Sequence, residues 1–513
     1  MHFQRLLLAV VPACAALTAC SGAATDRGGS GGYTATAGAA NGGRSGAGAG
    51  SGNTAGNSNA AGSGNAAGSS NAAGSGNAAG SSNAAGSSNA AGSGNAAGSG
   101  NLAGSSNAAG SSNGGAGAGA PGGGAGGAAP SPTSEDDGAD CPIGTLPELG
   151  ALTANAKLPD PFKKLDGTRM TTKAEWRCRR EEIKKLAEKF AYGTKLPKPE
   201  MVTSTISNTS ITVKVTDKGK STSFTAPIKL PTGGTAPYPV IIVYGGVSGA
   251  PLDTSVINSE GVALIGYDPY SVGKEGTART NKQGAYYDIA GNTSTTGLLV
   301  AWGWGVSRII DAIEGSDGKT LKANAVGVTG CSRFGKGSFI AGVFDQRVAL
   351  TMPIESGSAG VPIWRGIPGE GAQSLSSAYG EQPWFGDAFT SFTASPTKAP
   401  IDTHESVAMV APRGLFIMDN PHIANLGPKS ASVAALAGAE VYKALGAGDA
   451  ITYYSDVQSG THCSVRSEWA TPLKDNIERF LKKTGTAAGV MKISASAAGK
   501  LSDWSDWTTP TLN

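Results

Sequence analysis

One segment, TGCSRFGK at residues 329–336, constrains the fold of this chain more than any other. An apolar run typical of a β-strand ends at Gly330, and a run compatible with a helix, 334–344, begins just after Ser332. A second glycine, Gly335, follows, and residues without a Cβ allow a strand and a helix to approach closely. The sequence therefore predicts a strand, a sharp turn carrying the serine, and a helix.

This arrangement is typical of the nucleophile elbow of α/β-hydrolases, in which a strained turn lifts a serine hydroxyl above the sheet. A base and an ester can then reach the hydroxyl of Ser332. The glycine pattern here is G-x-S-x-x-G, one residue longer than the usual G-x-S-x-G. The alternative is an ordinary turn between strand and helix in which the serine only caps the helix.

The histidines support a catalytic interpretation, because α/β-hydrolases carry the serine, the acid and the histidine in that order along the chain. Of the four histidines, His2 lies in the export signal. His462 lies in a loop after a strand-like run at 451–455, where the last strand should deliver the base. We expect His404, at the start of an apparent helix, and His422, after a proline, to be structural.

Two carboxylates are candidates for the acid. Glu355 follows the apolar run 349–354, and Asp419 follows the run 414–418, which is the usual acid position in this fold. Either one would lie at the carboxyl end of a strand, where it can accept a hydrogen bond from the histidine Nδ1. Their spacing in the sequence leaves both open.

Strand-like and helix-like runs alternate through the second half of the chain, and the strands are nearly continuous in apolar residues. This pattern indicates a parallel sheet covered by helices on both faces. Two further runs, 204–215 and 223–230, predict an antiparallel hairpin that leads into the sheet. We expect one α/β domain at 141–484, a three-layer αβα sandwich of the α/β-hydrolase type with a mostly parallel central sheet.

Residues 1–20 have the features of a targeting signal: a basic start, an apolar run at 6–11 and small residues before Cys20. The ending Leu-Thr-Ala-Cys resembles the lipobox of bacterial lipoproteins, and Ser21 after it suits sorting to the outer membrane. The apolar run is too short to span a bilayer. We expect an exported lipoprotein at the outer membrane or cell surface, held only by a lipid on Cys20. Secretion after cleavage nearby is the alternative.

Residues 21–140 consist mainly of glycine, alanine, serine and asparagine, with a repeated hexapeptide N-A-A-G-S-[SG]. Apart from Leu102, the repeats offer no large apolar side chain whose burial could offset the entropy of ordering. We expect a disordered tether with a root-mean-square reach of roughly 60 Å.

Four cysteines remain outside the signal: Cys141, Cys178, Cys331 and Cys463. An even number in an exported domain suggests disulfides, and four cysteines allow three pairings. Cys331 adjoins Ser332 and Cys463 adjoins His462, so contact between serine and histidine would bring these two sulfurs within bonding range. Cys141 and Cys178 would then form the second bond. The sequence has no C-x-x-C or His-x-x-x-His pattern, so we expect no metal site.

Several segments, in order along the chain, are similar to those of the glucuronoyl esterases, carbohydrate esterase family fifteen. They are LPDPF, EWRCRREE, GCSRFGKG, PIESGSAG, GAQSLSSAYGEQPWF, APRGLFIMDN, LGPKS and THC. The resemblance covers 141–483 and leaves out the tether and the tail at 485–513. It implies the αβα hydrolase fold. It also implies hydrolysis of esters between glucuronic acid branches of xylan, often 4-O-methylated, and alcohols of lignin.

The resemblance also implies roles for individual residues. Ser332 would be the nucleophile, His462 the base and Glu355 the acid, with Asp419 as second choice. The side chain of Arg333 would help to hold the oxyanion, where a cation suits the developing negative charge. A disulfide between the cysteines next to the serine and the histidine is a trait of the family.

The same resemblance implies which residues contact the sugar. Lys336, Gln373 and Glu381 match residues that hydrogen-bond the sugar hydroxyls. Asn425 stands where fungal members have a tryptophan that contacts the sugar, so we expect looser or shifted preference for the ring or its 4-O-methyl group. The implied mechanism is two-step acyl transfer without a cofactor.

Two rival functions are a different carbohydrate esterase, acting on acetylated xylan or feruloyl esters, and a surface protein that only binds plant polysaccharide. A net charge of +3 gives no basic stripe for nucleic acid. We expect a monomer whose tail, with Trp504 and Trp507, docks on the domain.

Overall fold

The structure is a computed structural model that describes residues 134–513. The expected signal peptide with Cys20, and the expected tether as far as residue 133, lie outside the described residues. No helix within 134–513 is both long enough and apolar enough to cross a membrane.

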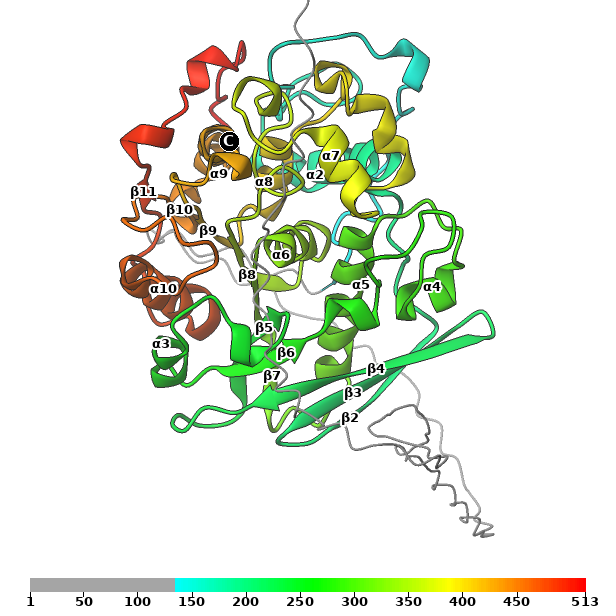
Figure 1. The fold of residues 1–513 in the computed structure, drawn as a ribbon, viewed down its shortest axis with the longest axis vertical. Coiled ribbons are helices and arrows are strands. Elements are labelled where there is room, and N and C mark those ends of the chain that lie inside the picture. Colours follow the sequence, from blue (N-terminus) through cyan, green and yellow to red (C-terminus); the bar gives the residue numbers. More distant parts are fainter. Residues whose placement is uncertain (1–133) are drawn as a thin grey trace, which may run out of the picture. The chain divides into compact units, whose positions relative to one another are not determined.

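A ten-stranded sheet forms the centre of the described part of the chain (Figure 1). The strand order is β11-β10-β9-β8-β7-β5-β6-β4-β3-β2. Pairs from β11 to β6 are parallel, and pairs from β6 to β2 are antiparallel. The strands are β2 (Met201–Ile206), β3 (Ser210–Asp217), β4 (Lys220–Lys229), β5 (Tyr238–Tyr244), β6 (Ala263–Tyr267), β7 (Leu321–Cys331), β8 (Val348–Ile354), β9 (Gly414–Met418), β10 (Ile451–Tyr454) and β11 (Met491–Lys492).

The α-helices are α2 (Trp176–Ala187), α3 (Thr254–Ser259), α4 (Ala285–Ala290), α5 (Leu298–Glu314), α6 (Arg333–Phe344), α7 (Leu375–Glu381), α8 (Thr403–Val410), α9 (Pro428–Ala444) and α10 (Ala470–Asn476). A π-helical segment, Ile477–Lys482, continues α10. Figure 1 shows α6 beside the middle of the sheet, directly after β7 in the chain.

The sheet separates two apolar cores, as the alternation of residues in β5 shows. Val240 and Ile242 belong to the core that contains buried side chains of α5, α6, α8 and α9, whereas Ile241 and Val243 belong to the core shared with α3 and α10. Successive side chains of a strand point to opposite faces, so helices must cover both faces to bury them. The predicted three-layer αβα sandwich with a mostly parallel sheet is confirmed.

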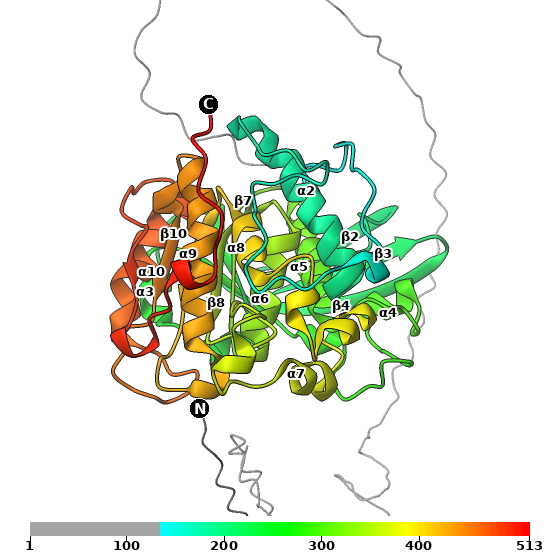
Figure 2. The same cartoon turned by 90° about the horizontal axis from the view of Figure 1, so that it is seen from above.

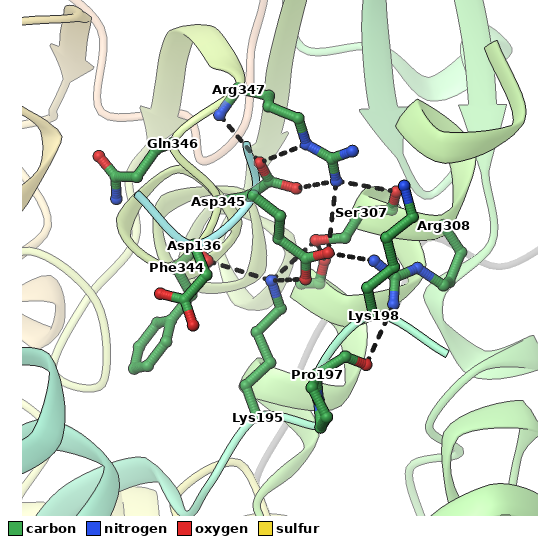
Figure 3. A network of polar contacts seen from close by, with 12 residues as sticks. Asp136, Lys195, Pro197, Lys198, Ser307, Arg308, Phe344, Asp345, Gln346 and Arg347 are labelled. Carbon is green, nitrogen blue, oxygen red and sulfur yellow. Dashed lines mark hydrogen bonds and ion pairs between the residues drawn. The ribbon is translucent and has the colours of Figure 1, made fainter. Parts of the chain in front are cut away.

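Residues at the end of the expected tether pack on this domain through a buried polar network (Figure 3). Glu135 accepts a hydrogen bond of 2.6 Å from Lys195 Nζ and pairs with Arg308 of α5. Lys195 Nζ also donates to Ser307 Oγ at 2.8 Å. Because buried charges are costly without their partners, this network fixes the segment to the domain. A disulfide between Cys141 and Cys178 joins the segment to α2.

The C-terminal tail lies against the domain, and Figure 2 shows it running beside α9. Trp507 Nε1 donates to the carbonyl of Leu158 at 3.1 Å, and its ring lies edge-on to Phe162. The carbonyl of the final residue, Asn513, accepts a hydrogen bond from the Lys173 amide at 3.0 Å. The two-residue strand β11, also in the tail, extends the sheet at one edge.

Candidate active site

Ser332 lies in a strained turn between β7 and α6. Its backbone has φ 60° and ψ −125°, a region that L-residues seldom adopt. A Cβ on Gly330 would lie 2.6 Å from the Phe334 carbonyl oxygen, and one on Gly335 would lie 2.4 Å from the Ile354 carbonyl oxygen. Both glycines are therefore required by close backbone packing, and the predicted strand, turn and helix are present.

Glu355 follows β8 and is fully buried. Its Oε2 lies 2.6 Å from His462 Nδ1 and accepts a hydrogen bond from the Cys463 amide at 2.8 Å. Its Oε1 accepts from Arg466 at 3.1 Å and from Asn420 Nδ2 at 3.3 Å. Burial tends to raise the pKa of Glu355, but the hydrogen bonds from His462, Cys463 and Arg466 outweigh burial and lower it below its usual range. The carboxylate is therefore ionised at neutral pH.

Asp419, the other acid candidate, lies after β9 and makes different contacts. Its Oδ1 accepts from the Asn420 amide at 2.9 Å, and its Oδ2 accepts from the Tyr453 hydroxyl at 3.2 Å. Burial, with a smaller effect of nearby Glu355, raises the pKa of Asp419 to about 7. Of the two carboxylates that the sequence left open, the structure brings Glu355 to His462.

A disulfide between Cys331 and Cys463 joins the loop of His462 to the end of β7. The Cα atoms of these cysteines are 5.7 Å apart. Their two sulfurs, one carboxylate oxygen of Glu355 and one ring nitrogen of His462 lie within 4.8 Å of one another, which is the kind of group that can bind a metal ion. The disulfide removes both thiolates, so this group does not suit a zinc ion. The imidazole is thereby held next to the residue that precedes Ser332.

Within residues 134–513, Ser332 and His462 are not joined by a direct hydrogen bond. Catalytic pairs are often looser in free enzymes and tighten when substrate binds. Among the five non-glycine residues with positive φ in the described range, three meet here: Ser332, Glu355 and Cys463. Such strained backbones persist where their surroundings fix them, and they concentrate at functional sites.

Arg333, the first residue of α6, extends away from the backbone toward two carboxylates. Its Nη1 lies 3.0 Å from Glu275 Oε2, and its Nη2 lies 3.7 Å from Glu381 Oε1. Glu275 also accepts a hydrogen bond of 2.5 Å from Trp384 Nε1. The guanidinium is therefore oriented from two sides, and its side chain retains 41% exposure.

The four candidates for sugar contact are linked to one another and to Arg333 through short contacts with Glu381 and Trp384. Gln373 Nε2 donates to Glu381 Oε2 at 2.7 Å, and the Gln373 amide donates to the Asn425 carbonyl at 3.0 Å. Lys336 is buried with its Nζ 4.9 Å from the centre of the Trp384 ring. Burial lowers the pKa of Lys336 to about 8. The buried Lys336 Nζ also donates to the Ser356 carbonyl at 2.6 Å. These contacts join the four residues into one polar cluster, in which Gln373, Glu381 and Asn425 are the less buried members.

Several neighbours of this site were not predicted from the sequence: Glu275, Trp384, Asn420 and Arg466. Arg466 could have been found from the sequence, because it is a charged residue four positions after the expected base His462. Glu275 lies in a loop without a motif, so no sequence signal marks it. In many hydrolases a loop at the end of a strand such as β5 supplies backbone donors for the oxyanion. Here the amides of the two glycines after Tyr244 are already used, because Gly245 donates to the Tyr267 carbonyl and Gly246 donates to the Val243 carbonyl.

The fold and the strained serine turn beside a histidine and a buried carboxylate define an α/β-hydrolase. The family model for fungal glucuronyl esterases matches residues 213–446. A 4-O-methyl-glucuronoyl methylesterase of Hypocrea jecorina is 38% identical over 381 residues, covering 73% of this chain and 80% of the relative. A 4-O-methyl-glucuronoyl methylesterase of Neurospora crassa is 37% identical over 366 residues, covering 70% of this chain and 90% of the relative. The chain belongs to the glucuronoyl esterase family, carbohydrate esterase family 15.

Solved structures agree with this assignment. The catalytic domain of a glucuronoyl esterase from Hypocrea jecorina aligns with a TM-score of 0.66 at 37% identity, covering 71% of this chain and 99% of the other. A glucuronoyl esterase from Sporotrichum thermophile, in complex with methyl 4-O-methyl-beta-D-glucopyranuronate, aligns with a TM-score of 0.66 at 35% identity, covering 71% and 97%. A bacterial member from Caldicellulosiruptor kristjansonii aligns with a TM-score of 0.61 at 28% identity, covering 70% and 98%.

Proposed function

We propose that this protein is a serine carboxylesterase that hydrolyses esters of glucuronic acid or 4-O-methyl-glucuronic acid. Its natural substrates are the esters that join the glucuronic acid branches of xylan to alcohols of lignin. The observation that carries the proposal is the 2.6 Å contact between His462 Nδ1 and the buried Glu355, next to the strained turn of Ser332. The names of the relatives and the ester bound in one solved relative support the choice of substrate.

The reaction proceeds by two-step acyl transfer. His462 takes the proton of the Ser332 hydroxyl as the oxygen attacks the uronate carbonyl, and then gives the proton to the departing alcohol. Water, activated by the same imidazole, releases the uronic acid from the serine. Glu355 holds the imidazole through Nδ1 and stabilises its charged form. Each step uses side chains of this chain alone, so no cofactor is required.

Negative charge on the carbonyl oxygen is stabilised by Arg333 in two ways. Its guanidinium lies beside the elbow, and its backbone N–H is at the first position of α6, where the helix offers no internal acceptor. Donors already oriented toward a developing charge accelerate acyl transfer, and removing one commonly costs roughly 100- to 1,000-fold in rate.

The sugar binds at the polar cluster formed by Lys336, Gln373, Glu381 and Asn425. The amide, carboxylate and ammonium groups there can each hydrogen-bond hydroxyls of a glucuronate ring. Asn425 is exposed and offers an amide where an aromatic ring would stack on the sugar. We therefore infer that Asn425 contacts the face of the glucuronate ring less strongly than a tryptophan would.

The protein works outside the cytoplasm, anchored as a monomer at the outer membrane or cell surface through a lipid on Cys20. The lipobox-like sequence supports the anchor, and two disulfides support an oxidising compartment. Its partners are glucuronoxylan and lignin–carbohydrate esters. The alternative of secretion after cleavage would leave the chemistry unchanged.

The test is the Ser332→Ala variant with a panel of esters. We expect hydrolysis of benzyl glucuronate to fall at least about 1,000-fold while the melting temperature stays near that of the wild type. Ser502→Ala, on the exposed tail, is the control and should keep full activity. Full activity of Ser332→Ala would remove the nucleophile. Faster turnover of acetylated xylan or feruloyl esters than of glucuronate esters would favour the rival esterase function.

A further inference from the structure

Arg466 is a buried arginine beside the candidate base, and its side chain is only 3% exposed. The central carbon of its guanidinium lies 5.2 Å from the centre of the Trp469 ring, which is itself buried. Arg466 directly precedes a short 3₁₀ helix, Ser467–Trp469, that leads into α10. A planar guanidinium stacked on an aromatic ring has a defined orientation. The side chain is therefore held in place from the α10 side.

One nitrogen of Arg466, Nη2, joins the acid to the loop of the base. It donates to Glu355 Oε1 at 3.1 Å and to the Thr461 carbonyl at 2.6 Å. Thr461 immediately precedes His462, so the second bond holds the backbone from which the imidazole extends. The other oxygen of the same carboxylate, Oε2, lies 2.6 Å from Nδ1 of His462. Arg466 therefore contacts both the acid and the backbone that carries the base.

Arg466 also brings a fixed positive charge to Glu355. The Cys463 amide and the Asn420 amide, which bond the same carboxylate, are neutral. His462 changes its charge during the reaction, whereas a guanidinium stays charged throughout. A positive charge close to a buried carboxylate favours the ionised form of that carboxylate. It also opposes the uptake of a proton by the pair that Glu355 forms with His462, because a proton would add a second positive charge.

Asp419 is a further titratable group near this carboxylate. It lies after β9, next to Asn420, and burial raises its pKa to about 7. The sulfur of Cys331, at the end of β7, lies 4.0 Å from Glu355 Oε2 but is bound in a disulfide and does not titrate. A test of pH dependence must therefore separate the effect of Arg466 from that of Asp419.

We propose that Arg466 is a positioning residue, which holds His462 through Glu355 and extends the esterase activity toward acid pH. The inference rests on the proposed function, because it concerns the same reaction. In the active form of the free enzyme the imidazole is neutral and the carboxylate is ionised. Since Arg466 disfavours an additional proton on this pair, the active form persists to a lower pH than it would without the arginine.

The experiment measures kcat and KM of Arg466→Gln for benzyl glucuronate across the pH range. The acid limb of kcat/KM is the range in which activity falls as the pH drops. We expect this limb to move up by roughly one pH unit, because a neighbouring opposite charge shifts a titration by roughly 1–3 units. At the pH optimum we expect kcat to fall roughly tenfold with KM within about twofold, since the buried arginine acts on the base and not on the bound ester.

Arg466→Lys tests whether the charge is the cause. An ammonium keeps the charge and three donors, so its acid limb should stay within about 0.3 pH units of the wild type. Arg169→Gln is the matched control, because Arg169 also pairs with a carboxylate, that of Asp160 at 2.7 Å. It likewise lies over an aromatic ring, that of Phe162, but it bonds the tail at the Thr508 carbonyl. Its pH profile should match the wild type, and a shift as large as in Arg466→Gln would overturn the proposal.

The contribution of Asp419 is removed by a second comparison. Asp419→Asn is compared with the double variant Asp419→Asn, Arg466→Gln under the same conditions. The shift of the acid limb should persist between these two proteins. Its disappearance would assign the shift to Asp419 and overturn the proposal.

An active Arg466→Gln enzyme whose acid limb matches the wild type would overturn the role of Arg466 and leave the esterase function standing. A shift in Arg466→Lys as large as in Arg466→Gln would also overturn it, because the positive charge would then not be the cause. If Arg466→Gln did not fold, Arg466→Met gives the same comparison with an uncharged side chain that still packs on Trp469. If neither folded, a displaced limb in Arg466→Lys would overturn the proposal. Wild-type protein that hydrolysed no glucuronate ester would refute the proposed function, and this inference with it.

Discussion

Nδ1 of His462 lies 2.6 Å from Oε2 of Glu355, although 107 positions separate the two residues in the chain. Glu355 is fully buried, whereas the side chain of His462 is 41% exposed. The buried carboxylate fixes the imidazole with its proton on Nδ1, which leaves Nε2 free to act as a base toward the solvent side. This one contact sets both the orientation and the tautomer of the candidate base.

Replacing the two carboxylates separately tests which one supports His462. Glu355→Gln keeps the shape but removes the charge that stabilises the imidazolium, so we expect kcat to fall about 100- to 10,000-fold. Asp419→Asn should change kcat by less than about fivefold, because the Asp419 carboxylate accepts hydrogen bonds from Asn420 and Tyr453. Steady-state kinetics on benzyl glucuronate measure kcat of both variants. A greater loss in Asp419→Asn would reverse the assignment of the acid.

The two disulfides should differ in their effect on catalysis. Removing Cys331–Cys463 by a double substitution to serine frees the loop of His462, and we expect a lower kcat as well as a stability loss of about 2–5 kcal/mol. Removing Cys141–Cys178 in the same way should cost stability in the same range and leave kcat of the folded enzyme unchanged. Chemical denaturation and kinetics on both variants check this. Equal effects on kcat would contradict the special role of the first bond.

Arg333→Lys tests the orientation of the charge beside the oxyanion. A lysine keeps the positive charge but cannot reach both Glu275 and Glu381 with a planar fork. We expect kcat to fall roughly 10- to 100-fold with little change in KM, since the lost interaction is made mainly in the transition state. Arg479→Lys, in the π-helical segment after α10, serves as the control. Wild-type kcat in Arg333→Lys would show that the guanidinium does not act on the oxyanion.

His404 should make the fold sensitive to acid. Burial lowers the pKa of His404 to about 4, while an unfolded histidine titrates near 6.5. Between these values the unfolded state binds a proton that the folded state does not, so stability is full above pH 6.5 and falls as the pH drops toward 4. The expected loss is roughly 3 kcal/mol.

His404→Gln isolates this effect, because the amide can still donate to the Pro159 carbonyl that His404 contacts. Burial raises the pKa of neighbouring Glu405 to about 7, which acts in the opposite sense, so the comparison must be between variant and wild type. Urea denaturation at pH 7 and pH 4.5 should show a smaller drop in the variant. An equal drop in both proteins would remove His404 as the cause.

Much of the fold was predictable because its signals are local. The apolar runs at β5 to β10 and the glycines around Ser332 follow from strand periodicity and from the space that a Cβ would need. The edge strand β11 was not predicted, since two exposed residues carry no periodic pattern. The positions of Glu275 and Trp384 beside Arg333 were also not predictable, because the separate segments that carry them meet there only after folding.

The sequence by itself determined the α/β sandwich, the strained serine turn and the short set of residues that could join it, because sterics and hydrophobic patterning act between near neighbours. Only the tertiary structure decided that Glu355 rather than Asp419 meets His462, and that Glu275 and Trp384 meet beside Arg333. Such contacts depend on how strand ends and loops converge across the sheet. That convergence is fixed by packing between segments a hundred or more residues apart, which no local pattern records.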